Sequence, residues 1–158
     1  HGGSYVFVLR KGKHSEVNAE QEIEKESKLG LYELKTYKKY AKKCIRVTKE
    51  FSKEVNNFKK DGYKVVGYGA AAKGNTFLNF AEVDLDYIVD DNELKWALLT
   101  PGRNIEIKSP SALSEEKADK TVVVPLAWNF FNEISKKAND ITKSDLKFIR
   151  YFPEVKVV

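Results

Sequence analysis

Residues 64–76 read KVVGYGAAAKGNT, and this stretch predicts the fold of the chain. A short valine-rich run reaches two glycines, small residues follow, and Asn75 to Ala81 can form a helix. Strand, turn and helix in that order make up the first half of a nucleotide-binding crossover. Within the stretch, Gly67, Gly69 and Ala72 fit the G-x-G-x-x-A pattern that such turns carry.

Each small residue of the pattern has an expected physical role. Gly67 allows a tight turn after the strand, and Gly69, which has no Cβ, lets a phosphate approach the backbone. Ala72 lets the helix pack close to the strand. The first turn of the helix then presents unpaired N–H groups and a partial positive charge, and Lys73 adds a formal charge beside them. These features together favour an anion at the turn.

A second apolar run, Leu85 to Val89, ends in the acids Asp90 and Asp91, about twenty residues after the turn. An acid at that point of the second strand is placed to hydrogen-bond a ribose hydroxyl. Two interpretations remain open. Either the turn binds a nucleotide-type ligand, or it is a tight βα turn that binds nothing.

Length and composition limit the class of protein. The chain has 158 residues, which is enough for one domain with a core. Its hydrophobic fraction of 42% and charged fraction of 32% are ordinary for a globular protein in water. No apolar run approaches the roughly 20 residues that span a bilayer, so we expect no membrane contact. One cysteine allows neither an internal disulfide nor a cysteine zinc site, which favours a cytoplasmic location.

Two features indicate the C-terminal piece of a longer protein. The chain has no methionine, and it begins with His1-Gly2-Gly3-Ser4 directly before a strand-like run, Tyr5 to Leu9. We expect residues 1–32 to be the tail of a preceding domain and a linker, with a short acidic helix from Glu16 to Glu26. Residues 33–158 are expected to form the C-terminal domain.

A long helix is predicted from Glu33 to Lys60. Its apolar residues recur at spacings of three and four and form one face, here called the apolar stripe. The stripe consists of Leu34, Tyr37, Ala41, Cys44, Thr48, Phe51, Val55 and Phe58. Cys44 is therefore expected to be a small core residue, and the helix offers a surface for a homodimer.

The same helix carries the positive charge of the chain. Ten basic and three acidic residues give it +7, against +5 for the whole chain. We interpret the lysines as a solvated face and expect no nucleic-acid partner, because no aromatic side chains alternate with them to stack bases.

Alternating strands and helices after Gly62 predict an α/β domain with a mainly parallel sheet and right-handed crossovers. About five strands are expected, over Tyr63–Tyr68, Leu85–Asp90, Asn104–Ile107, Thr121–Pro125 and Lys147–Tyr151. A further helix is expected over Trp128–Ala138, with Phe130, Phe131 and Ile134 facing the core.

The stretch at residues 67–76 resembles the signature of the C-terminal domain of sugar C-methyltransferases, which use S-adenosylmethionine to methylate nucleotide-linked sugars. Further motifs of that family follow in the same order, and the resemblance covers nearly the whole chain. They lie at residues 90–95, at Thr100-Pro101-Gly102, at Pro125 to Asn129 with Glu133, and at residues 153–158. Glu93 and Ala97 stand where the family usually has proline and glycine, so the loop after the second strand is expected to differ in shape and in ligand.

The resemblance implies a division of labour within a longer protein. The domain is expected to be Rossmann-like, with three layers, and to shape the nucleotide-sugar side of the cleft. S-adenosylmethionine would bind mainly outside these residues, in a preceding methyl-transfer domain. His1-Gly2-Gly3-Ser4 resembles the segment that the family places near the end of that domain. The residues that abstract the proton would also lie upstream. The chain itself offers only His1 and His14 as histidines and no catalytic or metal-binding set.

The expected ligand site lies outside the carboxyl ends of the strands, where three turns converge. It would bind the nucleotide and the sugar through Gly67, Tyr68, Gly69, Ala70, Ala71, Lys73, Gly74, Asn75, Thr76, Asp90, Asn92, Lys95, Trp128 and Asn129. In this view Asp90 or Asn92 meets a hydroxyl, Lys73 or Lys95 screens the phosphate charge, and Trp128 forms a wall. An NAD-dependent oxidoreductase and a non-catalytic nucleotide- or coenzyme-A-binding module are the alternatives.

Overall fold

The computed structural model describes residues 6, 8, 9, 11, 12 and 17–158, in two compact units, residues 1–45 and 46–158. The strand expected at Tyr5–Leu9 and the two histidines involve residues outside this described part, so those predictions stay predictions.

The first unit contains helix α1 (Val17–Lys28) and the beginning of helix α2 (Leu34–Lys60). The acidic helix expected from Glu16 is confirmed over its described residues and continues to Lys28. Gly30 then takes a φ of +71°, a left-handed value that glycine adopts without strain, and α2 begins four residues later. The long helix expected over Glu33–Lys60 is thus confirmed.

The second unit is a six-stranded sheet in the order β3-β2-β1-β4-β5-β6. Its strands are β1 (Lys64–Tyr68), β2 (Tyr87–Val89), β3 (Ile107–Lys108), β4 (Thr121–Pro125), β5 (Lys147–Arg150) and β6 (Lys156–Val157). The four pairings from β3 to β5 are parallel, and only β6 pairs antiparallel, with β5. The mainly parallel α/β sheet is therefore confirmed.

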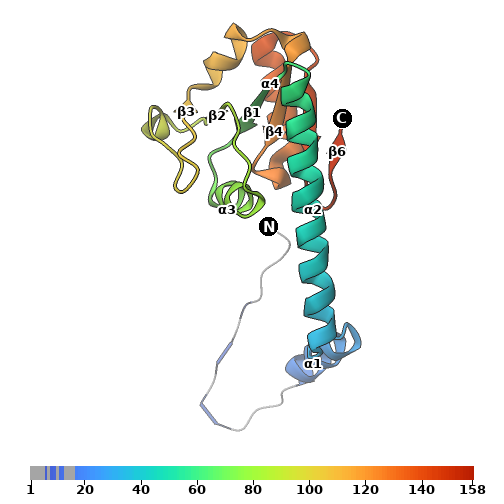
Figure 1. Cartoon of the computed structure of the whole chain (residues 1–158). Helices are drawn as coiled ribbons and strands as arrows, with labels where there is room; N and C mark the ends of the chain where they lie inside the picture. Colours follow the sequence, from blue (N-terminus) through green and yellow to red (C-terminus); the bar gives the residue numbers. More distant parts are fainter. Residues whose placement is uncertain (1–5, 7, 10, 13–16) are drawn as a thin grey trace. The chain divides into compact units, whose positions relative to one another are not determined.

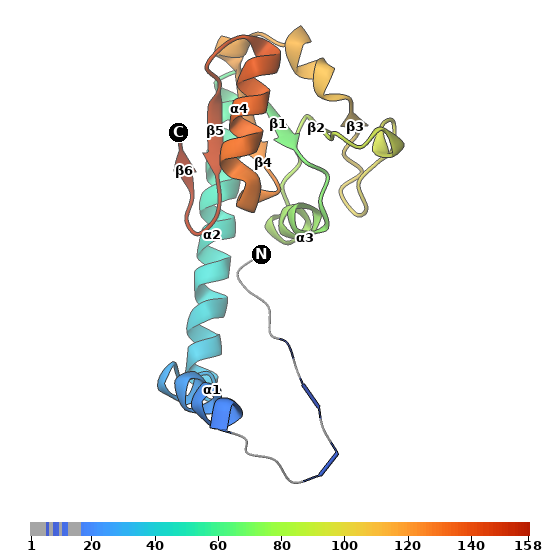
Figure 2. The same cartoon turned by 180° about the vertical axis from the view of Figure 1, so that it is seen from behind.

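Three layers form because successive side chains of a strand point to opposite faces of the sheet. Val65 of β1 joins a core with Phe51 and Val55 of α2 and Leu78 of helix α3 (Ala72–Ala81). The next residue, Val66, joins the opposite core with Ile134 of helix α4 (Phe131–Thr142). Figures 1 and 2, which view the sheet from its two sides, show α2 in front in one and α4 in front in the other.

Several boundaries differ from the sequence predictions, for local reasons. The third strand begins at Ile107 rather than Asn104, because Asn104 takes a φ of +54° and belongs to a turn. In this turn the N–H groups of Asn104 and Ile105 donate to the carbonyl and the hydroxyl of Thr100. Before α4, Trp128–Phe130 form a 3₁₀ turn, and Phe130 is 48% exposed rather than facing the core. Phe131 and Ile134 do pack inward as expected. Strand β6 was not expected; its two residues are too few to give a pattern.

Replacing Gly74 with valine tests how closely α3 lies against the sheet. A Cβ on Gly74 would stand 2.6 Å from the Cβ of Leu126, so the larger side chain must push the helix away. We expect the free energy of unfolding to fall by at least about 2 kcal/mol, measured in urea. Thr76→Val, on an exposed position of the same helix, is the control and should change stability by less than about 0.5 kcal/mol. Equal stability of the two variants would contradict this packing.

Candidate functional site at the carboxyl ends of the strands

Three neighbouring strands end at the same level. In the sheet register, Tyr68 at the end of β1 lies beside Val89 of β2 and beside Pro125 of β4. The chain leaves β1 toward β2 on one side and returns to β4 on the other, so the strand order reverses between β1 and β4. Ligands of open α/β sheets bind outside the carboxyl ends at such a reversal. The turns after β1, β2 and β4 therefore form the candidate site.

The glycines of the turn have different roles from those predicted. Gly67 lies inside β1 and not in a turn; a Cβ there would stand 2.8 Å from Ile88 and about as close to Leu85 and Leu126. The turn is made at Gly69, which takes a φ of +90°. Close packing of the helix on the sheet depends on Gly74 rather than on Ala72, which begins α3 and is exposed.

The first amides of the turn are already bonded within the chain. The N–H of Gly69 donates to the carbonyl of Val89 at 2.7 Å, and that of Ala71 to the carbonyl of Gly69 at 2.7 Å. The N–H of Ala70 donates to the carboxylate of Asp90 at 2.6 Å. An anion therefore does not find free donors at Gly69, Ala70 and Ala71, where the sequence pattern led us to expect them.

Free donors begin one residue later, at the first turn of α3. The N-cap, Ala71, has no side chain that could accept a hydrogen bond. Within the described part of the chain, the N–H groups of Ala72, Lys73 and Gly74 have no acceptor. Three such amides at the positive end of a helix dipole are a site for an anion. The candidate phosphate position is thus the start of the helix, which is the second half of the stretch Gly69–Gly74 where the sequence predicts a phosphate.

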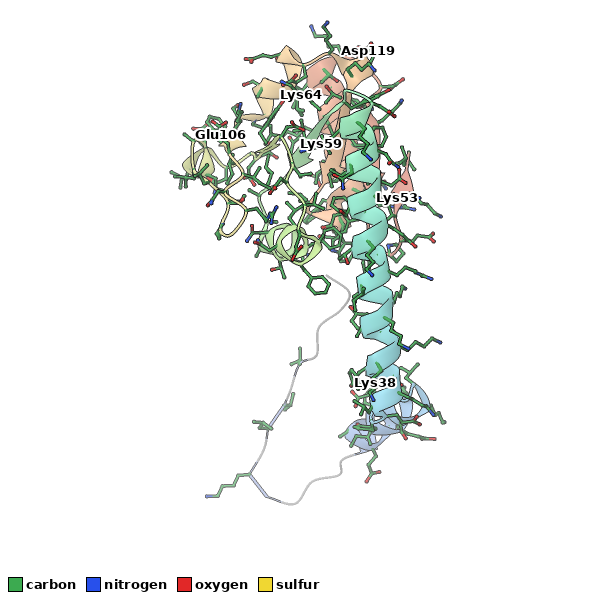
Figure 3. All side chains as sticks on the ribbon, viewed as in Figure 1. Lys38, Lys53, Lys59, Lys64, Glu106 and Asp119 are labelled. Atoms are coloured by element: carbon green, nitrogen blue, oxygen red, sulfur yellow. The ribbon has the colours of Figure 1, made fainter. Side chains whose placement is uncertain are left out.

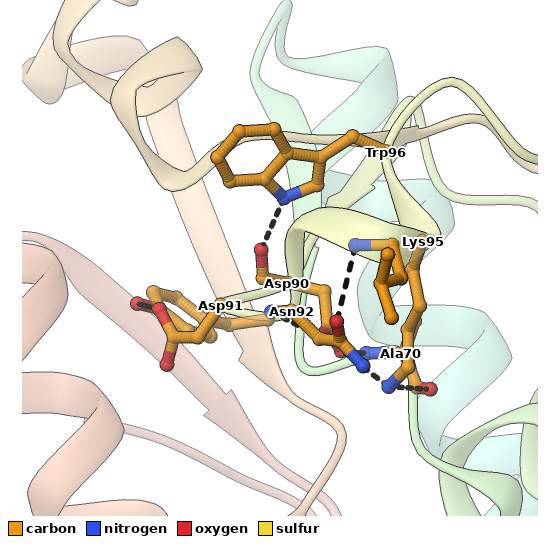
Figure 4. A network of polar contacts seen from close by, with 8 residues as sticks. Ala70, Asp90, Asp91, Asn92, Lys95 and Trp96 are labelled. Carbon is orange, nitrogen blue, oxygen red and sulfur yellow. Dashed lines mark hydrogen bonds and ion pairs between the residues drawn. The ribbon is translucent and has the colours of Figure 1, made fainter.

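Asp90 holds the turn after β1 to the loop after β2 (Figure 4). Its buried carboxylate accepts hydrogen bonds from the N–H of Ala70 and, at 2.9 Å, from the N–H of Asn92. The ammonium of Lys95 lies 3.0 Å from the same carboxylate and 3.1 Å from the carbonyl of Ala70. Three donors therefore use both carboxylate oxygens. Asp90 acts through Lys95 and the turn, and a ligand hydroxyl would have to compete with these bonds.

A second cluster joins α3 to the turn after β4. The ammonium of Lys73 donates to the side-chain carbonyl of Asn129 at 2.9 Å and lies 5.1 Å from the ring centre of Trp128. The Trp128 ring packs on Phe152, with ring centres 4.1 Å apart. Lys73, Trp128 and Asn129, predicted from separate motifs, are thus brought together beside the first turn of α3. Trp128 is half-buried, so it both packs and offers part of its ring to the site.

The remaining predicted side chains are engaged in local contacts. Asn75 accepts from Asn79, and the hydroxyl of Thr76 donates to the carbonyl of Ala72. Asn92 accepts from the N–H of Leu94 and so starts the short 3₁₀ turn Glu93–Lys95. Each amide or hydroxyl keeps further hydrogen-bonding capacity, but none is placed by these contacts alone to receive a ligand.

Tyr68 is buried, and its hydroxyl donates to the carboxylate of Asp91 at 3.0 Å. Burial, and then the charge of Asp91, raise the pKa of this tyrosine above its usual value. A neutral hydroxyl with a fixed partner suits a structural role. Tyr68 therefore has a structural role beside the site and does not act as a base at neutral pH.

Two residues that sequence reasoning missed complete the site. The indole N–H of Trp96 donates to the backbone carbonyl of Asp90 at 2.7 Å, which fixes the loop on its other side (Figure 4). Phe152 supports the ring of Trp128. Trp96 directly follows the motif at residues 90–95, so its position was a usable signal; Phe152 had none, because the contact joins distant segments.

The loop after β2 folds back onto α3. Asn79 donates to the carbonyl of Pro101, and a Cβ on Gly102 would collide with the Asn79 side chain. Ala97, at the position where glycine is usual in the resembling family, takes a φ of +60°. This left-handed value strains a residue other than glycine by roughly 1 kcal/mol.

No group of three or more His, Cys, Asp or Glu residues in the described part of the chain is arranged to hold a metal ion. None of the helices described is long and apolar enough to cross a membrane.

Comparison with known proteins agrees with the motifs around this site. Residues 1–153 match the family described as the C-methyltransferase C-terminal domain. The chain belongs to this family. It is 31% identical to the C-methyltransferase NovU of Streptomyces niveus over 165 aligned positions. The match covers all of this chain and 39% of NovU, so this C-methyltransferase C-terminal domain spans about two fifths of the length of that relative.

Asp90→Asn tests whether the Asp90 carboxylate holds the loops of the candidate site together. The amide would carry no charge for Lys95 and would offer one acceptor oxygen where three donors converge, which leaves buried donors unpaired. We expect a loss of about 2–4 kcal/mol in the free energy of unfolding. Asp91→Asn is the matched control; its side chain is 54% exposed, so its loss should stay below about 1 kcal/mol. Urea unfolding of both variants gives the comparison. Equal losses of unfolding free energy would show that Asp90 does not hold these loops together.

Proposed function

We propose that this chain is the nucleotide-sugar-binding domain of an S-adenosylmethionine-dependent sugar C-methyltransferase. Family membership supports the methyltransferase part of this proposal, and it favours neither an NAD-dependent oxidoreductase nor a free nucleotide- or coenzyme-A-binding module. The substrate class and the cofactor belong to the proposal alone.

The observation that carries the ligand class is the set of donors at the start of α3. Three free backbone amides, at Ala72, Lys73 and Gly74, lie beside the ammonium of Lys73, which Asn129 and Trp128 hold in place. Backbone amides with an adjacent cation bind phosphate in preference to a neutral ligand. A nucleotide-linked sugar supplies phosphates for these donors, and Trp128 supplies an aromatic surface for a ring.

The other predicted residues take supporting parts in this proposal. Lys95 contributes a second ammonium at the turn, fixed by Asp90 and by the carbonyl of Ala70. Lysine has three N–H donors, and two of the Lys95 donors are used, so one remains for a ligand. Asn75 and Thr76 lie in the first half of α3 and Asn92 lies in the loop after β2; in this proposal they offer hydrogen bonds to sugar or ribose hydroxyls.

Calorimetric titration of the 158-residue chain tests the ligand class. A panel of nucleotide sugars is compared with NAD and with S-adenosylmethionine, and we expect binding of a nucleotide sugar alone. Lys73→Met removes one charge-assisted hydrogen bond, worth about 1.5–3 kcal/mol, and should weaken binding tenfold or more. Lys136→Met, an exposed lysine of α4, is the control and should leave affinity unchanged. A lysine is preferred to Gly69 as the test position, because Gly69 has a φ of +90° and any side chain there strains the backbone.

Three results would contradict the proposal. They are the absence of binding by every nucleotide sugar, preferential binding of NAD, and equal affinities of the Lys73 and Lys136 variants.

The proposal also predicts that the chain does not transfer methyl groups by itself. The resemblance places the cofactor domain and the base in a preceding part of the protein, and β1 offers no acid before its turn for the ribose of S-adenosylmethionine. Incubation with labelled S-adenosylmethionine and the nucleotide-sugar panel should give no product above the protein-free background, measured by mass spectrometry. Turnover by the chain alone would show that the chemistry lies within these residues.

A further inference from the structure

The first unit exposes its apolar side chains. Among the side chains described before Thr48, none of the apolar ones is buried. From Ile23 to Tyr40, six large apolar residues are more than half exposed: Ile23 (55%), Leu29 (70%), Tyr32 (63%), Leu34 (68%), Tyr37 (53%) and Tyr40 (64%). An exposed concentration of this kind marks an interaction surface, because single-chain proteins rarely leave such groups in water.

The apolar stripe of α2 has the same regular spacing along the whole helix. Its later members Thr48, Phe51 and Val55 are buried in the second unit, whereas its first members, Leu34 and Tyr37, are exposed. A spacing of three and four keeps all these residues on one side of a helix. A helical segment with no buried face is marginal in water, so the first half of the stripe requires a cover of its own.

The charge around this half of the stripe limits what can cover it. Residues 34–45 contain five lysines and no acid. Figure 3 shows Lys38 on this part of α2 and Lys53 further along the same helix. Two copies of the segment packed against each other would bring like charges together, which costs free energy. An apolar surface with an acidic rim is the complementary partner.

We propose that the first half of the stripe, from Leu34 to Cys44, docks onto the preceding part of the parent methyltransferase through an apolar surface with an acidic rim. This proposal rests on the proposed function, since it needs a parent longer than this chain. Two observations support the preceding part of the parent protein as the docking partner. The matching family is described as a C-terminal domain, and the aligned relative carries 61% of its length outside the match.

Hydrogen exchange of backbone amides tests the docking in two proteins, this 158-residue chain and the complete gene product that contains it. In the chain alone, amides of residues 34–45 should exchange fast while those of residues 48–58 are protected. In the complete gene product, exchange at residues 34–45 should slow at least tenfold, and residues 48–58 should not change. Equal rates at residues 34–45 in both proteins would overturn the proposal.

Paired variants of the complete gene product locate the surface. Leu34→Gln with Ala41→Gln changes two positions of the stripe and should return residues 34–45 to the fast exchange of the chain alone. Lys35→Gln with Lys42→Gln introduces the same residues one position further along, off the stripe, and should keep most of the protection. If both pairs behave alike, the stripe is not the docking surface. Unchanged protection at residues 48–58 checks that each variant is folded.

Other occupants give different results. If a second copy covers the stripe, the 158-residue chain alone will show protection of residues 34–45 that rises with protein concentration, and sedimentation will show a dimer. Either finding overturns docking onto the preceding part. The exchange rates need no ligand, so they separate this proposal from nucleotide-sugar binding, which the calorimetric titration decides.

Discussion

The arrangement of the loops at the candidate site depends on one buried carboxylate, which requires hydrogen-bond donors. Asp90 is 7% exposed, and a charge so far from water is stable only when hydrogen-bond donors replace its hydration. The chain supplies them from three places: the turn after β1, the start of the next loop, and Lys95. Meeting this requirement fixes the distance between the two loops. The indole of Trp96, bonded to the carbonyl of the same residue, removes the remaining freedom of the loop.

The arrangement also explains why the proposed anion position lies at the start of α3. The carboxylate of Asp90 accepts a hydrogen bond from the N–H of Ala70, so its negative charge already lies at the middle of the turn. A second anion there would meet repulsion, which Lys95 only partly offsets. The first turn of α3 lies beyond that charge, has free amides, and has Lys73 beside it. Backbone geometry and electrostatics therefore favour the same place.

Sequence reasoning succeeded where a segment has a regular apolar pattern of its own. The valine-rich runs gave β1 and β4, since a strand buried on both faces is apolar at every position. The apolar stripe gave α2, and separate motifs named Lys73, Trp128 and Asn129, which the fold brings together. It failed where a role depends on a neighbour that is distant in sequence. The pattern gave the tight turn to Gly67 and the close helix packing to Ala72. The turn is instead at Gly69, and the close packing is at Gly74 against Leu126, which lies more than fifty residues away. Asp90 was likewise found in the right place, and its partners became clear only in three dimensions.

The free amides at the start of α3 have a consequence for how such a domain changes over evolution. Backbone N–H groups persist under most side-chain substitutions, so the proposed anion position at Ala72, Lys73 and Gly74 would be insensitive to mutation as long as the helix starts there. Side chains around it, such as Trp128 and Asn129, have no such protection and are free to diverge. If the proposed anion position is correct, related domains could exchange the side chains that recognise one ligand for those that recognise another, and the charged group of each ligand would still bind at the start of α3.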